Sequence, residues 1–410
     1  MTTPSIEEQL RQQDRSTAQF RAIQMASNAI ANLRVIGRIN HDSDVSTPWR
    51  GSTVVICGAG PSLTDALPGL RDLTRASTQA VIVAVNTSLP ALLAADVTPD
   101  VVVTIEGMPV SWQIRDFAAR SRPEFVVDLL SHPDAVAMAA GRDNSTWIAS
   151  GQPMLLGVLD AIGAVPTPYG SSATTAAFAL AVSRGASQII LVGIDLCYRG
   201  DRAYADGTPW GGLRVEHVAG DRLRYTGTES RDELHDSAGI PRVPHERTEF
   251  RVPGQLGGEV WTTLEFEDQR RWFSAASSSV AYGTVWNASG GARIEGAIGL
   301  APADIASQSR LPLAADRIRR PVPRPHAWEP YLRDECDRAE AMADAMLAGD
   351  GEKAVRLAAR GMPFVEGVAT GDIVGLQRTA MQARWKRRGI YEIWKAAARW
   401  TRDRIGEVAQ

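Results

Sequence analysis

Residues 54–63 read Val-Val-Ile-Cys-Gly-Ala-Gly-Pro-Ser-Leu, and this stretch decides the fold class. Its apolar start predicts a short buried strand, and the two glycines that follow allow a sharp turn. Pro61 suits the first turn of a helix and Ser62 can cap one. Leucine and alanine then recur at helical spacing through Leu73. A buried strand, a glycine turn and a helix in this order are typical of an open α/β sheet.

The same alternation of strands and helices continues along the chain. Unbroken apolar runs predict buried strands, and segments with helical spacing separate them. The predicted strands after the first cover residues 80–85, 101–105, 125–127, 146–148 and 188–192, and the predicted helices include residues 5–39, 63–73, 89–93 and 172–184. Strands without polar alternation, joined by helices, indicate a Rossmann-like α/β fold with a mostly parallel sheet and helices on both faces.

The periodicity is lost after Asp195. Residues 198–260 are rich in Gly, Arg, Asp and Pro, so we expect a long loop that is functional or partly structured. Residues 266–277 predict a helix, residues 283–286 a strand, and the chain from residue 327 onward is mainly helical. The predicted parts are an N-terminal helical segment and linker (1–48), an α/β catalytic domain (49–300) and a C-terminal helical region (301–410).

Composition excludes several classes of protein. Of 410 residues, 44% are hydrophobic and 22% charged, which is typical of a globular chain and not of a disordered one. The net charge of −3 argues against a general nucleic-acid binder. Cys57, Cys197 and Cys336 lie far apart without zinc spacing. The polar start resembles no secretory signal, and no apolar run reaches the roughly 20 residues of a membrane span. We expect a cytoplasmic protein with no metal site and no membrane span.

The glycine-rich turn is the first candidate site. The bare N–H groups of a helix N-terminus bind anions, so Gly58, Ala59, Gly60, Pro61 and Ser62 predict an anion or nucleotide site. The turn is not a Walker A loop, because no Gly-Lys-Ser/Thr follows it. It also departs from the dinucleotide fingerprint, in which a third glycine and a later acidic residue are expected. A tight strand–helix turn without a ligand is the alternative.

Two further polar segments follow predicted strands or open helices. Asn86 comes directly after the second strand, where its amide can bind a ribose or a base edge, or cap the next helix. Gly170, Ser171, Ser172 and Thr174 open the helix over residues 172–184. Their hydroxyl and N–H groups can hold a phosphate or carboxylate, or serve only for capping and close packing.

Acidic and histidine residues supply the candidates for proton transfer. Asp195 follows an apolar strand, where it can act as a base, orient a sugar hydroxyl, hold a metal or only tie down the next loop. Glu106 and Asp100 flank the third strand. Four histidines fall in predicted loops and are candidates for a general base, although none is in an HExxH arrangement: His132, His217, His235 and His245.

The stretch from Gln382 to Arg404 is strongly basic. It holds eight basic residues against two acidic ones, interleaved with Trp385, Trp394 and Trp400. A basic helix with aromatic residues can touch a membrane surface or an acidic partner. A solvated face with tryptophans in the core is the alternative.

Five segments in register resemble the motility-associated factor (Maf) glycosyltransferase family. They are Gly58–Leu63, Thr98–Glu106, Gly170–Ala176 with Ile189–Leu196, Pro253–Thr262 and Trp286–Gly296. The resemblance spans roughly residues 50–300. The same superfamily includes MptE-like 6-hydroxymethylpterin diphosphokinases. The opening turn also resembles the Cys-Gly-Asn-Gly-Pro-Ser-Leu turn of bacterial sialyltransferases, which cradles CMP.

The resemblance implies a sialyltransferase-like fold. It also implies an enzyme that transfers a nonulosonic acid from a CMP donor to a serine or threonine of flagellin. It implies that the turn at residues 58–62 and Asn86 hold the nucleotide, and that the Gly170–Thr174 segment holds the phosphate or carboxylate of the donor. Asp195 and the loop from Tyr198 to Asp206 then border the reaction centre. The same resemblance makes Gly290 and Gly291 the floor of the crevice.

The sequence departs from these families at three positions. Ala59 stands where the sialyltransferases have Asn, and Glu106 stands where Asp is usual. Tyr204-Ala205 stands where many relatives have His-Ala, so a histidine base is missing there. We take Asp195, Glu106 and Tyr204 as the catalytic candidates.

Three functions remain open. The first is transfer of a sialic-like sugar from a nucleotide donor to a hydroxyl of a protein or glycan, flagellin included, with two helix N-termini stabilising the departing phosphate without a metal. The second is pyrophosphoryl transfer to a pterin, with ATP and Mg²⁺ held by Asp195, Glu106 or Asp206. The third is a non-catalytic protein whose basic, Trp-rich C-terminal helix contacts a membrane surface or an acidic partner.

Overall fold

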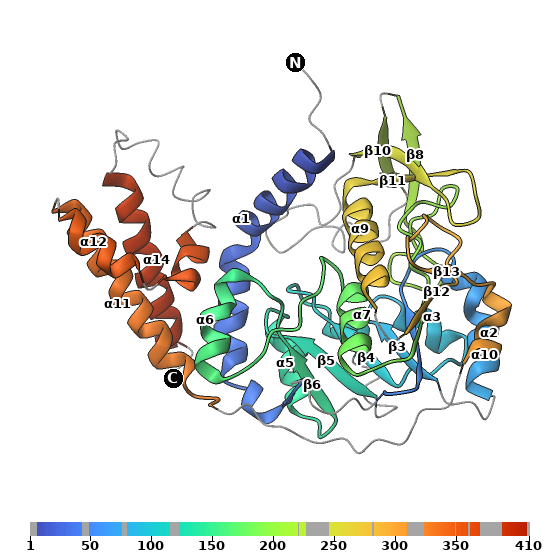
Figure 1. Cartoon of the computed structure of the whole chain (residues 1–410), viewed down its shortest axis with the longest axis horizontal. Coiled ribbons are helices and arrows are strands. Elements are labelled where there is room, and N and C mark those ends of the chain that lie inside the picture. Colours follow the sequence, from blue (N-terminus) through green and yellow to red (C-terminus); the bar gives the residue numbers. More distant parts are fainter. Residues whose placement is uncertain are drawn as a thin grey trace.

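The glycine-rich turn follows β2 (Thr53–Cys57), an interior strand of a nine-stranded parallel sheet. In the computed structural model the described residues are 6–42, 49–75, 80–114, 123–219, 221–226, 246–280, 283–309, 324–348, 350–359, 361–369 and 388–407. Val55 of β2 lies between Ile82 and Ile190 of the neighbouring strands, and β2 is buried along its whole length. The unbroken apolar runs in the sequence therefore mark the sheet interior (Figure 1).

The strand order is β1-β6-β5-β4-β3-β2-β7-β12-β13. After β2 the chain adds β3 to β6 on one side and then returns to place β7 on the other. The order of the strands therefore reverses between β2 and β7, the position at which open α/β sheets bind ligands. The remaining strands of this sheet are β1 (Asn40–His41), β3 (Val81–Val85), β4 (Val101–Thr104), β5 (Glu124–Asp128), β6 (Ser145–Ile148), β7 (Gln188–Val192), β12 (Thr284–Asn287) and β13 (Ile298–Gly299).

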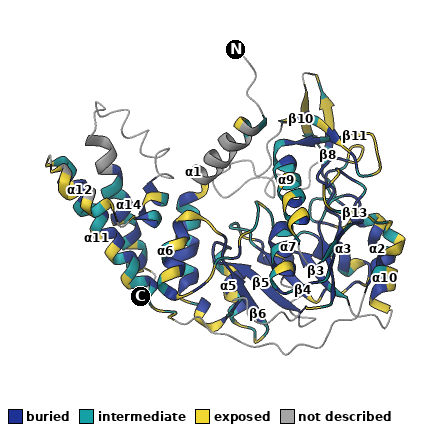
Figure 2. Cartoon of the chain, in the orientation of Figure 1, coloured by how far each residue is buried: buried dark blue, intermediate teal, exposed yellow. Residues whose placement is uncertain are grey.

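Helices cover both faces of the sheet, so the predicted Rossmann-like α/β class is confirmed. Val101 and Val103 of β4 face a core formed with α7 and α9, whereas Val102 between them faces a core formed with α1, α5 and α6. The strands are buried and the outer helices are partly exposed (Figure 2). These helices are α2 (Leu63–Arg75), α3 (Leu89–Ala94), α5 (Pro133–Ala140), α6 (Pro153–Ile162), α7 (Ala173–Ser183), α9 (Leu264–Ser279), η2 (Pro302–Asp304) and α10 (Ile305–Gln308).

The N-terminal helix crosses the carboxyl edge of the sheet. α1 (Ile6–Leu33) is shorter than the predicted helix, because a 3-10 turn, η1 (Ile36–Arg38), replaces its last part. β-branched residues and Gly37 lower the helix propensity there. Asn28 donates hydrogen bonds to the carbonyls of Gly107 and Leu130, and Asn32 to those of Leu129 and Ser131. α1 is therefore tied to the loops that follow β4 and β5.

The region after β7 corrects one expectation. Residues 198–260 do not form one long loop, because they contain β8 (Arg214–Val218), β9 (Arg222–Thr226), β10 (Glu246–Pro253) and β11 (Glu259–Thr263), a four-stranded antiparallel sheet. β8 and β9 each bury one residue, Val215 and Leu223, and the others are exposed or half-buried. Each of these two strands is five residues long with two apolar side chains, such as Leu223 and Tyr225 of β9, which is too little to separate a strand from a loop in the sequence. Residues 220 and 227–245 lie outside the described residues.

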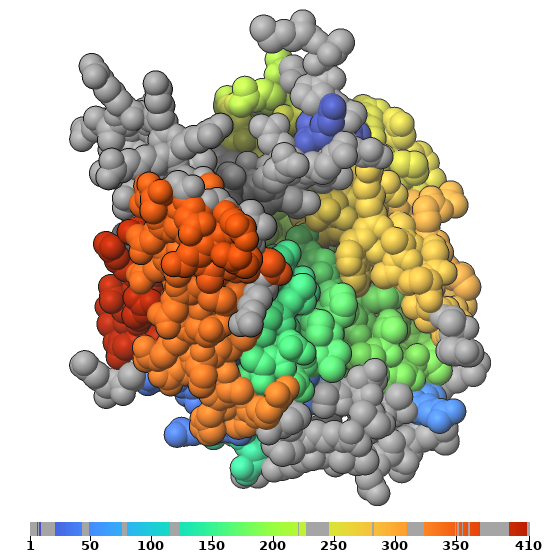
Figure 3. Space-filling model, turned by 60° about the vertical axis from the view of Figure 1, so that its left-hand side comes forward, coloured from blue at the N-terminus to red at the C-terminus, as the bar shows by residue number. Residues whose placement is uncertain are grey.

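The C-terminal region is helical, as predicted. It contains α11 (Trp328–Leu347), α12 (Gly351–Ala358) and α14 (Arg388–Glu407). Its apolar residues share one core with α1, α5 and α6. Figure 3 shows the orange surface of α11 against the green surface that includes α6. The predicted domain boundaries at residues 48 and 300 stay predictions.

In the described part of the basic C-terminal stretch, the basic side chains pair with carboxylates. Arg402 pairs with Glu340 and Asp337 of α11, and Lys395 pairs with Asp344. Trp394 and Trp400 pack against the shared core. Residues 382–387, including Trp385, lie outside the described residues. The described part of the stretch is therefore better explained by helix packing than by a membrane contact. Within the described ranges, every helix is too short or too polar to cross a bilayer.

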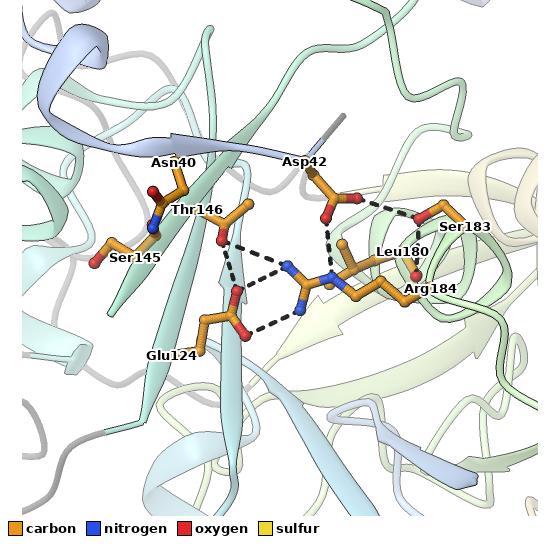
Figure 4. Close-up of polar contacts among 8 residues, drawn as sticks. All are labelled: Asn40, Asp42, Glu124, Ser145, Thr146, Leu180, Ser183 and Arg184. Atoms are coloured by element: carbon orange, nitrogen blue, oxygen red, sulfur yellow. Dashed lines mark hydrogen bonds and ion pairs between the residues drawn. The ribbon is translucent and has the colours of Figure 1, made fainter. Parts of the chain in front are cut away.

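A buried arginine network fastens the end of α7 to the sheet (Figure 4). Arg184 donates two hydrogen bonds to Glu124, at 2.7 and 2.9 Å, and one to Asp42 at 2.9 Å. Its guanidinium carbon also lies 4.7 Å from the ring centre of Trp49. The two carboxylates raise the pKa of Arg184 against the effect of burial, so the arginine stays charged.

Replacing Arg184 by Met should lower the free energy of unfolding by about 3–5 kcal/mol, because Glu124 and Asp42 would remain buried without their cation. Urea unfolding measures this. Arg356→Met is the control, since its pair with Glu352 is exposed, and it should change stability by no more than about 0.5 kcal/mol. Equal effects of the two substitutions would contradict a structural role for the network.

Candidate functional site

The backbone segments after β2 and β7 touch at the point where the strand order reverses. Gly60 N–H donates to the carbonyl of Gly193 and Gly58 N–H to that of Val192, both at 2.8 Å. A Cβ on Gly58 would lie 2.5 Å from the Gly193 oxygen, and Gly193 itself has φ +63. These positions require glycine because the two segments approach so closely. The sequence predicts that these glycines form a sharp turn, and in the structure this turn packs against the segment after β7.

Asp195 occupies the N-terminus of α2. Its Oδ2 accepts hydrogen bonds from the backbone N–H of Ser62 at 3.0 Å and from the Ser62 hydroxyl at 2.8 Å. Both residues are only 2% exposed. A Cβ on Gly60 would collide with this carboxylate, and one on Gly291 would collide with the Asp195 backbone. The glycines of both segments therefore form a close-fitting cradle around Asp195.

This arrangement uses most donors of the glycine-rich turn. The N–H groups of Gly58, Gly60 and Ser62 all bond within the chain, and Pro61 has none. Ala59 is half-buried, and its N–H has no partner among the described residues. The positive end of α2 is thus occupied by the chain's own carboxylate. Nucleotide binding by this turn stays a prediction. The geometry leaves mainly the N–H of Ala59 for such a ligand.

Burial raises the pKa of Asp195 to about 6, while the hydrogen bonds from Ser62 and the charge of Arg199 act in the opposite direction. Its Oδ1 is enclosed and has no hydrogen-bond partner within the described ranges. Asp195 therefore titrates close to neutral pH, but the structure encloses it. This suits a residue that positions the turn better than one that takes a proton from an acceptor.

The loop from Tyr198 to Asp206 lies directly on the glycine-rich turn. Ala205 N–H donates to the Ala59 carbonyl at 2.9 Å, and Arg199 pairs with Asp65 of α2 at 2.6 Å. Tyr204 is half-buried, and burial raises its pKa to about 12. The structure thus brings Tyr204 to the turn, as the prediction requires.

Glu106 and Asn86 lie at the carboxyl ends of β4 and β3. The Glu106 side chain is 39% exposed, accepts a hydrogen bond from Met108 N–H at 3.2 Å and lies 3.9 Å from Arg21 of α1. The Asn86 amide is buried and donates to Gln113 at 2.7 Å. Of the two, only Glu106 presents much of its side chain to solvent.

The N-terminus of α7 has a different character. Ser172 caps the helix, and its capping box with Thr175 satisfies the N–H groups of those two residues. The N–H groups of Ala173 and Thr174 have no partner among the described residues, and Ser171 is exposed with its hydroxyl bonded to Asp268 at 2.8 Å. Gly170 packs against Trp272, where a Cβ would lie 2.9 Å from the ring. This helix end keeps free donors.

A buried aspartate that the sequence reasoning missed holds this segment. Asp128, the last residue of β5, accepts hydrogen bonds from the N–H groups of Leu130 and Ser150, at 2.6 and 2.9 Å. It also bonds the Tyr169 hydroxyl, and burial raises its pKa to about 6. Tyr169 directly precedes Gly170, so Asp128 positions the start of α7. Its place after an apolar strand, like that of Asp195, was the available signal.

The remaining candidates lie elsewhere. Asp100 precedes β4 and accepts from Ile82 N–H, at the opposite edge of the sheet from the turn. His132 caps α5, and His217 of β8 lies 2.6 Å from Glu249 of β10. His235 and His245 fall outside the described residues. In the parts of the chain that the structure describes, no three His, Cys, Asp or Glu residues are grouped to hold a metal ion.

Comparisons with known proteins agree with this architecture. Residues 27–201, which hold β2 to β7 and Asp195, match the family model described as 6-hydroxymethylpterin diphosphokinase MptE-like. The Maf glycosyltransferase of Magnetospirillum magneticum AMB-1 is structurally similar, with a TM-score of 0.60 over 95% of this chain at 15% identity. The chain shares the fold of this Maf glycosyltransferase. It spans 60% of that glycosyltransferase chain. No curated protein matches the sequence. The resemblance inferred from the five segments is thus confirmed for the fold.

Gly60→Ala should destabilise the protein by about 1–3 kcal/mol, because the new methyl group would displace the Asp195 carboxylate. Gly151→Ala is the matched control, since a Cβ there meets nothing within 4 Å. Thermal or urea unfolding compares the two. If Gly60→Ala proved as mild as the control, the close contact between turn and carboxylate would be disproved.

Asp195→Asn should become progressively more stable relative to the unsubstituted protein as the pH rises from 4 to 7. The folded-state pKa of Asp195 lies above its ordinary value, so ionisation costs folding free energy, by up to roughly 3 kcal/mol, over that range. Asparagine never ionises and still accepts both Ser62 hydrogen bonds. The free energy of unfolding of both proteins at several pH values tests this. A difference independent of pH would contradict a buried, ionising Asp195.

Proposed function

We propose that this protein is a transferase that moves a sugar from a nucleotide-linked donor to a hydroxyl group of a protein or glycan. The observation that carries the proposal is the open N-terminus of α7, a helix that packs against β2, β3 and β4. Its free N–H groups and neighbouring hydroxyls suit a phosphate group that becomes more negative as the sugar leaves. A sialic-like sugar on CMP is the donor we favour, because the sequence segments resemble enzymes that use such donors.

The phosphate is assigned to the N-terminus of α7 because the N-terminus of α2 is already occupied. Ala173 and Thr174 supply backbone N–H groups there, and Ser171 and Ser172 supply hydroxyls. A helix of this length adds its dipole, whose positive end is at the same place. A metal ion is not required for charge stabilisation of this kind. Ala59 and Asn86 then remain as the residues that bind the nucleoside.

Glu106 is our choice for the base that accepts the proton of the acceptor hydroxyl. Its carboxylate is partly exposed, whereas Asp195 is enclosed by Ser62 and the glycines. The raised pKa of Tyr204 keeps its hydroxyl protonated at neutral pH, so it can donate a hydrogen bond but cannot serve as the base. Asp195 is a positioning residue in this scheme.

The matched family model favours a second candidate, pyrophosphoryl transfer from ATP to a pterin. This reaction requires Mg²⁺, held by oxygen ligands such as Glu106 or Asp206 together with the phosphates of ATP. The two candidates therefore differ in their nucleotide and in their need for a metal.

Titration calorimetry with CMP in the presence of EDTA should show binding, and Ala173→Pro should weaken it by about 10-fold or more. Proline suits the first position of a helix but lacks the N–H that would bind the phosphate. Ala173→Gly is the matched control, since it keeps the N–H and should retain affinity. Binding of ATP only with Mg²⁺, and no binding of CMP, would replace the proposal by the second candidate.

Ser62 is less suited to such a test. Ser62→Arg would place a long charged side chain at the turn, but it would also disrupt a residue that is only 2% exposed. Loss of nucleotide binding in that variant would not separate a binding role from a folding role.

A further inference from the structure

Three tyrosines and an arginine gather between the antiparallel sheet and the glycine-rich turn. This tyrosine–arginine cluster consists of Tyr198, Tyr204, Tyr225 and Arg247. The hydroxyls of Tyr198 and Tyr225 are 2.5 Å apart, and the guanidinium carbon of Arg247 lies 5.5 Å from the ring centre of Tyr225. The apolar residues around the tyrosines form a small core of their own. Neither the fold nor the phosphate site described above explains why an arginine is placed here.

Arg247 has unused donors. Its Nη1 lies 3.0 Å from Glu265 of α9, which is its one ion-pair partner among the described residues. Its Nε is enclosed and has no hydrogen-bond partner in the part of the chain that is described. A guanidinium carries five N–H donors, and a buried donor without an acceptor lowers the stability of the fold. The side chain is 19% exposed, so it is not wholly sealed.

Tyr204 provides a second donor close by. Its hydroxyl has no hydrogen-bond partner among the described residues, and the residue is half-buried. Tyr204 and Tyr225 pack against the same small core, and Arg247 lies over the ring of Tyr225. The next residue, Ala205, bonds the Ala59 carbonyl of the turn. The cluster thus adjoins the turn.

We propose that Arg247 and Tyr204 bind an anionic oxygen group of the substrate, a carboxylate or a phosphate. This inference rests on the proposed function for the identity of that substrate as an acidic sugar or its nucleotide. Guanidinium is the side chain best matched to the two oxygens of a carboxylate or phosphate, and the phenol adds one hydrogen bond. The aromatic surroundings lower the local dielectric constant and strengthen such a contact.

The site is distinct from the N-terminus of α7. That helix end offers backbone N–H groups and small hydroxyls, whereas the cluster offers the fixed positive charge of Arg247 on β10. An acidic sugar linked to a nucleotide carries both a carboxylate and a phosphate. Two separate anion sites would bind the two groups at once and would discriminate against neutral sugars.

Arg247→Met is the test, with Arg251→Met as the matched control. Arg251 lies on the same strand, and its side chain is 55% exposed and pairs with Glu259. Calorimetry measures the affinity for N-acetylneuraminic acid, its neutral methyl ester, CMP and cytidine. We expect Arg247→Met to lower the affinity for N-acetylneuraminic acid by at least 10-fold and to leave the affinities for cytidine and the methyl ester unchanged. Arg251→Met should leave all of these affinities unchanged.

The outcomes separate the sources of the anion. A loss confined to CMP, with N-acetylneuraminic acid unchanged, would still support the anion site but assign it to phosphate. Equal affinities in Arg247→Met and Arg251→Met would overturn the inference, and so would a failure of the unsubstituted protein to bind any anionic probe. Tight CMP binding, together with an affinity for N-acetylneuraminic acid that does not depend on Arg247, would overturn the inference and leave the proposed function intact. If Arg247→Met does not fold, Arg247→Lys, which keeps the charge, replaces it in the same measurements.

Discussion

The hydrogen bonds from Ser62 to Asp195 join the two halves of the sheet at the place where the strand order reverses. They link the first turn of α2 to the segment after β7, 133 residues away. Gly58, Gly60, Gly193 and Gly291 exist as glycines because this contact leaves no room for a Cβ. The loop over the turn, with Ala205 bonded to Ala59, follows from the same packing. The close approach of the segments after β2 and β7 therefore depends on one buried carboxylate.

Because of this constraint, the N-termini of α2 and α7 differ. The N-terminus of α2 is neutralised by Asp195 and is structural, whereas the N-terminus of α7 keeps N–H groups without partners among the described residues. Asp128, through Tyr169, secures α7 in the same way that Asp195 secures α2. Two buried aspartates, each at the carboxyl end of a strand, thus position the elements around the crevice. Glu106 differs from both, because its side chain is partly exposed, and this is why we propose it as the base.

Much of the sheet was predictable because buried parallel strands are unbroken apolar runs, and β2 to β7 each contain one. The glycine-rich turn was predictable as a turn, but its partner was not, because no local pattern shows that Ser62 meets Asp195 across the strand reversal. The antiparallel sheet was missed since β8 and β9 each bury a single side chain. Arg247 was also missed, because only the pairing of β10 with β9 brings it to Tyr225.

A crystal structure of the protein with bound CMP tests the central claim most directly. The account predicts that the phosphate lies within hydrogen-bonding distance of the Ala173 and Thr174 N–H groups and that Ser62 still donates to Asp195. A phosphate bound to the N–H of Ser62, with the Asp195 carboxylate displaced, would contradict it.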